Sequence, residues 1–251
     1  MSSQKMVNKK GRDKATSFIR AAVEASKSSL LEYEAEQVAK QYGIKVATSG
    51  LAQTEKQAVL LAKGLGFPLA MKIVSEDILH KSNVGGVKTG INSIGEARQG
   101  YNQLIKNVKK ANPKASINGV LVQKMAPKGQ EFVVGANRDP QFGPTVMFGL
   151  GGIYVELFKD VAFRIAPVSE RDALEMMKET KSSAILTGFR GSKPLDIRAA
   201  AKTIMQVSDL MMDQKDVESV DINPLFIYPK GVMAVDVRII LGKSEGKPAP
   251  I

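Results

Sequence analysis

Segments typical of strands and segments typical of helices follow one another along this chain without strict alternation. Ser93–Glu96 has the serine-to-glutamate spacing of a capping box and predicts a helix that ends before Asn112-Pro113. Ser29–Glu32 has the same spacing and predicts a helix that ends at Gly43. A doubly wound sheet requires regular alternation, so this order favours an α+β architecture that can divide into two lobes, with Asn112-Pro113 as the best boundary candidate. Strands are expected at 44–47, 69–74, 87–91, 120–125, 131–137, 145–148, 161–166, 217–222, 225–228 and 232–237.

The composition excludes several classes of site. The chain has no cysteine, which removes disulfides, iron–sulfur clusters, thiolate zinc sites and cysteine nucleophiles. Its one histidine, His80, cannot form a three-histidine zinc site. The patterns of the phosphate loop, the dinucleotide-binding turn and the hydrolase nucleophile elbow are also missing. Any nucleotide site must therefore use another geometry.

The net charge of +11 permits binding of nucleic acid or of anionic small molecules. Residues 1–27 contain seven Lys and Arg against two Asp and Glu, so almost half of the excess lies in this one segment. We expect it to be a flexible basic tail. The rest of the chain has no basic stripe with interleaved aromatic residues, so no nucleic-acid partner is expected. No apolar run is long enough to span a bilayer, and a cytoplasmic protein without membrane contact is expected.

The segment Asp221-Ile222-Asn223-Pro224 predicts a metal site together with Asp236. A hairpin whose tip is Pro229-Lys230 places Asn223 directly opposite Asp236. Two oxygen ligands at this spacing suit Mg²⁺, which takes further ligands from water and phosphate. A register slip of one residue would separate the pair, and two polar residues at strand ends are the alternative interpretation.

His80 lies in the polar loop 75–86, which ends in Gly85-Gly86. Imidazole is a nucleophile that can carry a phosphoryl group as a phosphoramidate, and backbone N–H groups of glycines can bind phosphate oxygens. A surface histidine without a function is the alternative. Four further features are candidate ligands of a phosphate, a hydroxyl group or another anion. Each of them can instead be a solvated surface group or a simple structural element. They are Lys72 in an apolar strand, Glu131, Arg164 and the Gly151-Gly152 turn.

Taken together, these segments resemble the ATP-grasp β subunit of ADP-forming acetate/acyl-CoA synthetases, in the succinyl-CoA synthetase superfamily. The resemblance covers about residues 28–241, and the block His80–Val87 is similar to the acetate/acyl-CoA branch. It rests on the order and spacing of the segments 69–74, 80–87, 122–125, 129–131, 149–152, 163–164 and 221–225. The family often has an aspartate where this chain has Asn83.

The resemblance implies a two-lobed ATP-grasp fold. The implied division has a basic tail at 1–27, a main lobe at 28–46 and 118–242, a smaller lobe with the His80 loop at 47–117, and a C-terminal tail at 243–251. It implies that His80 and Asp221 are catalytic, His80 as a phosphohistidine and Asp221 as the carboxylate that holds its imidazole. Asn223 and Asp236 would bind Mg²⁺. The residues that would bind ATP or ADP are Lys72, Gly85, Gly86, Val87, Gln123, Lys124, Met125, Glu131 and Arg164, with 123–125 forming the hinge beside the adenine.

The implied reaction converts acyl-CoA, ADP and phosphate to the free acid, CoA and ATP. A CoA-binding α subunit would phosphorylate its own histidine, and the phosphoryl group would then pass to His80 and to ADP. The implied assembly is an α2β2 heterotetramer. Two alternatives stay open: a carboxylate–amine ligase with a dispensable His80, and a binding module with a degenerate nucleotide site.

Overall fold

The computed structural model describes residues 3–78, 80–152 and 160–242, and it divides into two compact units. Unit 1 contains the segments 1–46 and 128–251, and unit 2 contains 47–127. The expected smaller lobe also begins at 47 but ends at 117, and this end is wrong. Residues 119–124 form a strand that pairs with two other strands of unit 2, so hydrogen bonding assigns them to that unit. The C-terminal tail 243–251 lies outside the described residues.

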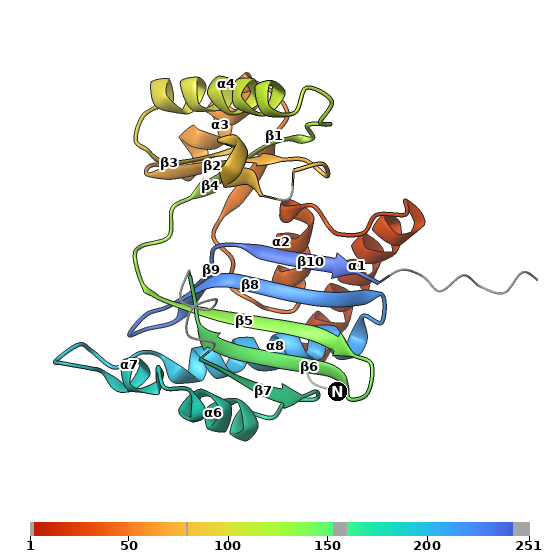
Figure 1. Cartoon of the computed structure of the whole chain (residues 1–251), viewed down its shortest axis with the longest axis vertical. Coiled ribbons are helices and arrows are strands. Elements are labelled where there is room, and N and C mark those ends of the chain that lie inside the picture. The colour runs from red at the N-terminus through yellow and green to blue at the C-terminus, as the bar shows by residue number, and fades with distance from the viewer. Residues whose placement is uncertain (1–2, 79, 153–159, 243–251) are drawn as a thin grey trace, which may run out of the picture. The chain divides into compact units, whose positions relative to one another are not determined.

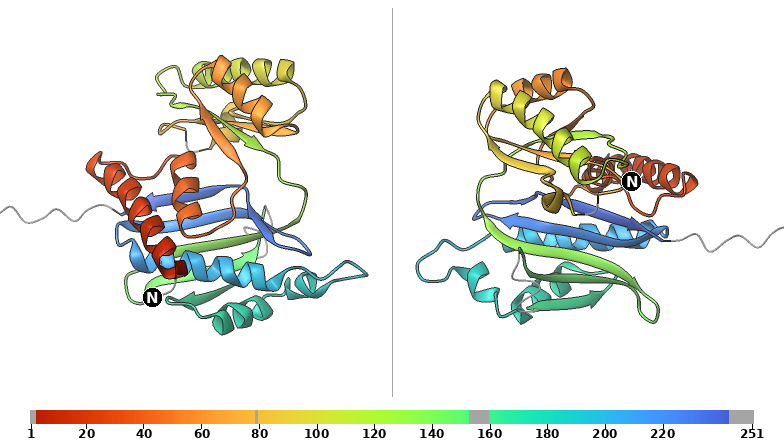
Figure 2. Two further views of the ribbon diagram at one scale, coloured as in Figure 1. Left: turned by 180° about the vertical axis from the view of Figure 1, so that it is seen from behind. Right: turned by 45° about the horizontal axis from the view of Figure 1, so that its top comes forward.

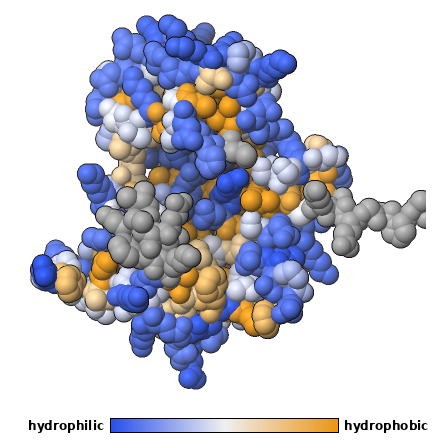
Figure 3. Space-filling view, viewed as in Figure 1, coloured by the Kyte–Doolittle hydropathy of each residue, from blue (hydrophilic) through white to orange (hydrophobic). Residues whose placement is uncertain are grey.

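Unit 2 is a four-stranded antiparallel sheet in the order β1-β4-β2-β3. Its strands are β1 (Ser49–Ala52), β2 (Leu69–Val74), β3 (Val87–Ile91) and β4 (Gly119–Lys124). The helices α3 (Glu55–Leu65) and α4 (Ile94–Ala111) lie on the same face of the sheet (Figure 1). Met71 and Ile73 of β2 pack with Leu104 of α4 in the core between helices and sheet. The outer surface over α4 is mainly hydrophilic (Figure 3), as the amphipathic sequence of this helix requires.

Unit 1 contains a larger antiparallel sheet in the order β10-β8-β5-β6-β7, with β9 paired to β8. Helix α8 lies against one face of this sheet, as the view from behind in Figure 2 shows. Phe132 and Phe148 of neighbouring strands stack in the core with ring centroids 5.2 Å apart. The strands are β5 (Gln130–Asp139), β6 (Gly143–Leu150), β7 (Val161–Ile165), β8 (Val217–Ile227), β9 (Val232–Ala234) and β10 (Val237–Leu241). The helices are α1 (Ser3–Glu24), α2 (Glu32–Gln41), α6 (Glu170–Glu179), α7 (Ser183–Thr187) and α8 (Ile197–Asp213).

The expected hairpin register at the C-terminal end of the fold is confirmed. Ile222 pairs with Val237, and Leu225 pairs with Ala234, so Asn223 and Asp236 lie opposite each other between these pairs. The chain turns at Pro229-Lys230, where the backbone N–H of Tyr228 donates to the carbonyl of Gly231. Gly231 has a φ of +82°, which a glycine adopts without steric cost after the proline-containing turn.

Three local expectations differ from the structure. The helix expected after Ser29 begins only at Glu32, because Ser29 forms a β-bridge with Ile240. Glu34, not Glu32, reaches back to the helix start, where its Oε2 accepts from the N–H of Leu31 at 2.9 Å. The segment 44–47 forms a single bridge rather than a strand, and β1 follows it instead. By contrast, Ser93 caps α4 as expected, with its Oγ 3.1 Å from the N–H of Glu96.

The largest correction concerns the expected flexible tail at 1–27. Residues 3–24 form α1, and Ala15, Ile19 and Ala22 of this helix are buried in the core of unit 1. Arg12 forms ion pairs with Asp209 and Asp213 of α8 at 3.1 and 2.7 Å. At least one positive charge of this segment, that of Arg12, therefore forms ion pairs that hold α1 against α8.

Replacing Ile19 with alanine tests whether α1 belongs to the folded body. Ile19 is 1% exposed. Truncating a side chain buried to this degree leaves a cavity, and we expect a loss of about 2–4 kcal/mol in the free energy of unfolding. Denaturant titration measures this loss, with Lys14→Ala on the exposed face of α1 as the control. Equal stability of the two variants would mean that α1 does not pack.

Candidate functional site

The central strand β8 presents polar side chains on the face of the sheet opposite its core. Val220 and Ile222 are buried, whereas the side chain of Asp221 between them is exposed. A register shift in the β5–β8 pairing lies between Phe132 and Val134, at the level of Asn223 and Pro224. This irregularity lets the strand bring Leu225 back into the core while Asn223 stays half-buried.

Asn223 meets the glycine pair that follows β6. Its Oδ1 accepts from the backbone N–H of Gly152 at 3.2 Å. The N–H of Gly151 donates to the carbonyl of Glu131 at 2.9 Å. Gly152 has a φ of +69°, and a β-carbon at this position would lie 2.5 Å from Oε2 of Glu131. The Gly151-Gly152 turn therefore brings the predicted metal ligand Asn223 and the predicted ribose ligand Glu131 to one place, and its backbone conformation favours glycine at position 152.

Asp221 and Asp236 are close enough for the charge of one to act on the other. The protein around Asp221 and the negative charge of Asp236 both raise the pKa of Asp221 above its ordinary value, while Arg238 acts in the opposite direction. Two carboxylates that repel each other favour a proton or a cation between them. Arg238 pairs with Asp221 across the β8–β10 ladder.

The donor set of this corner suits Mg²⁺. Asn223 and Asp236 offer an amide oxygen and a carboxylate, and Mg²⁺ is commonly held by one or two such side chains together with phosphates and water. Within residues 3–78, 80–152 and 160–242, no group of three or more His, Cys, Asp and Glu side chains is placed to hold a metal ion. The Mg²⁺ assignment to Asn223 and Asp236 stays a prediction.

In unit 2, Lys72 and Gln123 are buried polar residues on the sheet. Lys72 is 8% exposed and Gln123 is 1% exposed. Lys72 pairs with Leu121, and Gln123 pairs with Ala70, so strand alternation places both side chains on the face opposite the one that α3 and α4 cover. Lys72 is thus not an exposed surface lysine. Its role as a phosphate ligand stays a prediction.

The predicted adenine hinge ends strand β4. The N–H of Lys124 donates to the carbonyl of Thr48 at 2.8 Å, and the N–H of Met125 donates to the carbonyl of Pro68 at 3.1 Å. The ammonium group of Lys124 donates to the carbonyl of Phe67. These bonds hold the segment in a defined conformation within unit 2. Its role as the adenine hinge stays a prediction.

His80 is exposed and comes directly before the one-turn helix η1 (Lys81–Val84). The N–H of Gly85 donates to Ser82 and that of Gly86 to Lys81, at 3.1 and 2.8 Å, which closes the turn. Gly86 also accepts from the N–H of Ile73 in β2. The chain after His80 is thus fixed to the sheet while the imidazole itself faces solvent. Val87 begins β3.

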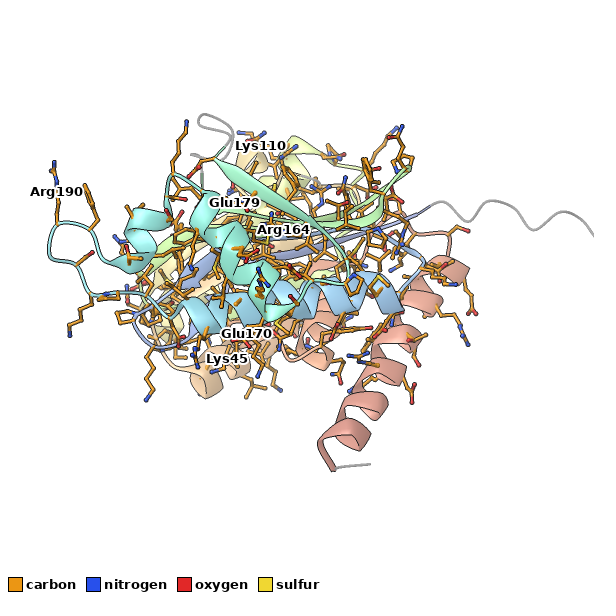
Figure 4. All side chains as sticks on the ribbon, turned by 90° about the horizontal axis from the view of Figure 1, so that it is seen from below. Lys45, Lys110, Arg164, Glu170, Glu179 and Arg190 are labelled. Carbon is orange, nitrogen blue, oxygen red and sulfur yellow. The ribbon has the colours of Figure 1, made fainter. Side chains whose placement is uncertain are left out.

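Arg164 lies in β7 and binds Glu179 at the end of α6, in a two-pronged ion pair (Figure 4). One guanidinium nitrogen also donates to the carbonyl of Phe163 at 2.8 Å. The hydrogen bond and charge of Glu179 raise the pKa of Arg164. Phosphate binding by Arg164 stays a prediction, and it would require exchange of this ion pair.

Comparison with known proteins identifies the family. The model of the ATP-grasp domain matches residues 21–241. The β subunit of ADP-forming acetate–CoA ligase I from Pyrococcus furiosus is 46% identical over 91% of this chain and 98% of its own. This chain belongs to the family of ADP-forming acetate–CoA ligase β subunits.

Solved structures agree with this membership. The dinucleotide forming acetyl-coenzyme A synthetase 1 of Ca. Korarchaeum cryptofilum, in complex with coenzyme A, Ca-AMPCP and HgCl+, has a TM-score of 0.89. Its sequence is 47% identical over 91% of this chain and 100% of that chain. The same enzyme with Mg-AMPPCP has its phosphohistidine segment pointing towards the nucleotide binding site, with a TM-score of 0.82, 44% identity and coverage of 91% and 100%. This β subunit therefore has an α+β, two-lobed ATP-grasp fold. Among its described residues, no helix is long and apolar enough to cross a membrane.

The sequence alone allows two roles for Gly151-Gly152: it binds an anion, or it only turns the chain. The structure adds that Gly152 contacts both Asn223 and Glu131. The only local signal for this role is the glycine pair itself, because its partners lie far away in the chain.

A Gly152→Ala substitution is expected to displace Glu131 and to weaken nucleotide binding by this β subunit. The new methyl group would overlap the Glu131 carboxylate, and the positive φ adds a cost of about 1 kcal/mol. Gly143 has a φ of +75°, and a β-carbon added there would have no other atom within 4 Å, so Gly143→Ala reproduces the backbone strain alone. Calorimetric titration with Mg-ADP measures the nucleotide affinity of the Gly152→Ala and Gly143→Ala variants. Equal affinities would show that the contact with Glu131 does not matter for the nucleotide.

An Asp221→Asn substitution is expected to stabilise the fold at neutral pH. The raised pKa means that the folded state holds this proton more tightly than the unfolded chain does. The parent protein therefore loses stability as the pH rises from the unfolded pKa to the folded one, and it stays penalised above that range. We expect a higher Tm for the variant at pH 7 and no difference at about pH 3, below the ordinary carboxyl pKa. Glu218→Gln, on the same strand, is the control. A lower Tm of the Asp221 variant at pH 7 would contradict the argument.

Proposed function

We propose that this chain is the nucleotide-binding subunit of an enzyme that converts acyl-CoA, ADP and phosphate to the free acid, CoA and ATP, with His80 as the phosphoryl carrier. The observation that supports the proposal most directly is the placement of His80. It is the one histidine of the chain, and its exposed side chain lies in a loop whose two ends are anchored to unit 2. The related synthetase, whose phosphohistidine segment points towards the nucleotide binding site, supports the same role.

The chemistry needs a nucleophile that accepts and releases phosphorus. In the direction of ATP synthesis, an unprotonated nitrogen of His80 attacks the phosphoryl group carried by a histidine of the partner chain, and the bond from phosphorus to that partner nitrogen breaks. A terminal oxygen of ADP then attacks the same phosphorus, and the bond to His80 breaks. A phosphohistidine keeps the transfer potential of the phosphoryl group while the group moves between two sites that exclude water.

The residues proposed for the nucleotide are those that the similarity to the family implies. Lys72, Gly85, Gly86 and Val87, with the hinge at 123–125, are proposed to bind the phosphates and the base. Glu131 is proposed to bind the ribose, Asn223 and Asp236 are proposed to bind Mg²⁺, and Asp221 is proposed to hold the imidazole of His80. When bound, Mg²⁺ neutralises charge on the phosphate oxygens during transfer. The pairing of Asn223 with Asp236 and the contact of Asn223 with Gly152 support this assignment.

The partner is proposed to be a CoA-binding α chain in an α2β2 heterotetramer. Membership among β subunits requires an α chain, and the matched relative is named as one subunit of such a ligase. The acyl group would be held by the α chain, so it is not assigned from this sequence. A cytoplasmic location is proposed, where nucleotide, CoA and acid are available together.

A His80→Asn substitution tests the relay. With γ-³²P-ATP, Mg²⁺ and the α chain, we expect acid-labile label on the β chain of the parent and none on the variant, measured after the chains are separated by electrophoresis. Ser82→Ala, an exposed position in the same loop, should keep the label. Label that persists on the His80→Asn β chain would overturn the relay, and an active enzyme without an α chain would favour a carboxylate–amine ligase.

A further inference from the structure

The loop that carries His80 is held at its N-terminal end by Asp77 and Ile78. Oδ2 of Asp77 accepts from the backbone N–H of Ser116 at 2.7 Å, and the N–H of Asp77 donates to Oγ of Ser75 at 3.2 Å. The side chain of Ile78 is 7% exposed and belongs to the core of unit 2. This end of the loop is therefore part of the folded body only two residues before His80.

The C-terminal end is held by a side chain from α4. Nδ2 of Asn107 donates to the carbonyl of Gly85 at 3.0 Å, and Oδ1 of Asn107 accepts from Nε2 of Gln103 at 2.6 Å. Gly85 has a φ of +62° and ends η1. The second contact orients the amide of Asn107, so that its donor faces Gly85 and its acceptor faces Gln103.

The fit between Asn107 and Gly85 is close. A β-carbon at position 85 would lie 2.7 Å from Nδ2 and 3.3 Å from Cγ of Asn107. A side chain on residue 85 would therefore push Asn107 away, in addition to straining the backbone. The contact therefore depends on both residues, on Gly85 for the space and on Asn107 for the hydrogen bond.

We propose that Asn107 is a positioning residue for phosphoryl transfer at His80. Its amide fixes the point at which the His80 loop joins β3, and thereby limits the orientations that the imidazole samples. The inference rests on the proposed function, because it assigns to this contact a purpose in the relay. Asn107 does not touch the reacting groups itself.

The physical consequence is a specific change in the kinetics. Positioning a nucleophile raises the fraction of time in which it is aligned for attack, whereas it leaves the affinity of a separate ligand site unchanged. Asn107 is not among the nucleotide residues proposed above, and it bonds to the carbonyl of Gly85, an acceptor that does not bind a phosphate oxygen. Loss of the contact should thus lower kcat and leave the KM for ADP unaltered.

The test uses the complete enzyme, assembled from this β subunit and its α chain, with acetyl-CoA, phosphate and Mg-ADP as substrates. Asn107→Asp keeps the shape and the acceptor for Gln103 but replaces the donor to Gly85 with an oxygen. We expect about a three- to tenfold lower kcat for Asn107→Ala, at least as large a loss for Asn107→Asp, and a KM for ADP within about twofold of the parent. Asn102→Ala is the matched control, since Asn102 lies on the same helix and its Nδ2 donates to Glu55 instead.

A double-mutant cycle measures the coupling between Gly85 and Asn107 in kcat. General destabilisation of the protein would not produce such a coupling. Gly85→Ala should reduce kcat by a larger factor in the parent than in the Asn107→Ala background, because the overlap with Nδ2 disappears in the latter. Equal factors in the two backgrounds would contradict direct coupling between the two residues.

The outcomes separate this inference from the proposed function. If His80→Asn keeps the phosphate label, the relay itself fails. If His80→Asn loses the label while Asn107→Ala and Asn107→Asp match Asn102→Ala in kcat, only the positioning role fails. A raised kcat for Asn107→Ala would also overturn it. A lower Tm with unchanged kcat, measured well below the transition, would assign Asn107 a structural role alone.

Discussion

The candidate site of unit 1 depends on the position of β8 inside its sheet. This strand is hydrogen-bonded to β5 on one side and to β9 and β10 on the other, so its register is set from both edges. Val220 and Ile222 must face the core, and the pleat then directs Asp221 to the other face. A slip of one residue would bury the carboxylate and expose the apolar side chains. The chemistry of the site is thus tied to the hydrophobic packing of the sheet.

The same sheet brings together residues that are distant in the sequence. β5 lies between β8 and β6, so the start of β5 and the end of β6 both approach the bulge of β8. Glu131, Gly152 and Asn223 meet there through backbone and side-chain contacts. The turn has no side chains, so acceptors of Asn223 and Glu131 can each bond to one of its two backbone N–H groups.

Unit 2 combines rigidity with exposure around its histidine. The ends of the loop are fixed through Asp77 and through Gly85, and the sheet behind them is covered by α3 and α4. His80 is exposed between these fixed points. A phosphoryl carrier needs this combination, because a fully mobile nucleophile is rarely aligned and a buried one cannot meet a second partner.

Local sequence patterns determined much of this protein. The N-cap at Ser93, the strand at 69–74 and the Pro229-Lys230 hairpin depend on neighbouring residues, and the structure confirms each of them. The tertiary structure decided the rest. Ser29 pairs with Ile240 instead of capping a helix, α1 is held by Asp209 and Asp213 of α8, and Arg164 binds Glu179. Each of these contacts joins segments whose proximity depends on the order of strands and helices in the fold, and a local pattern carries no information about that order.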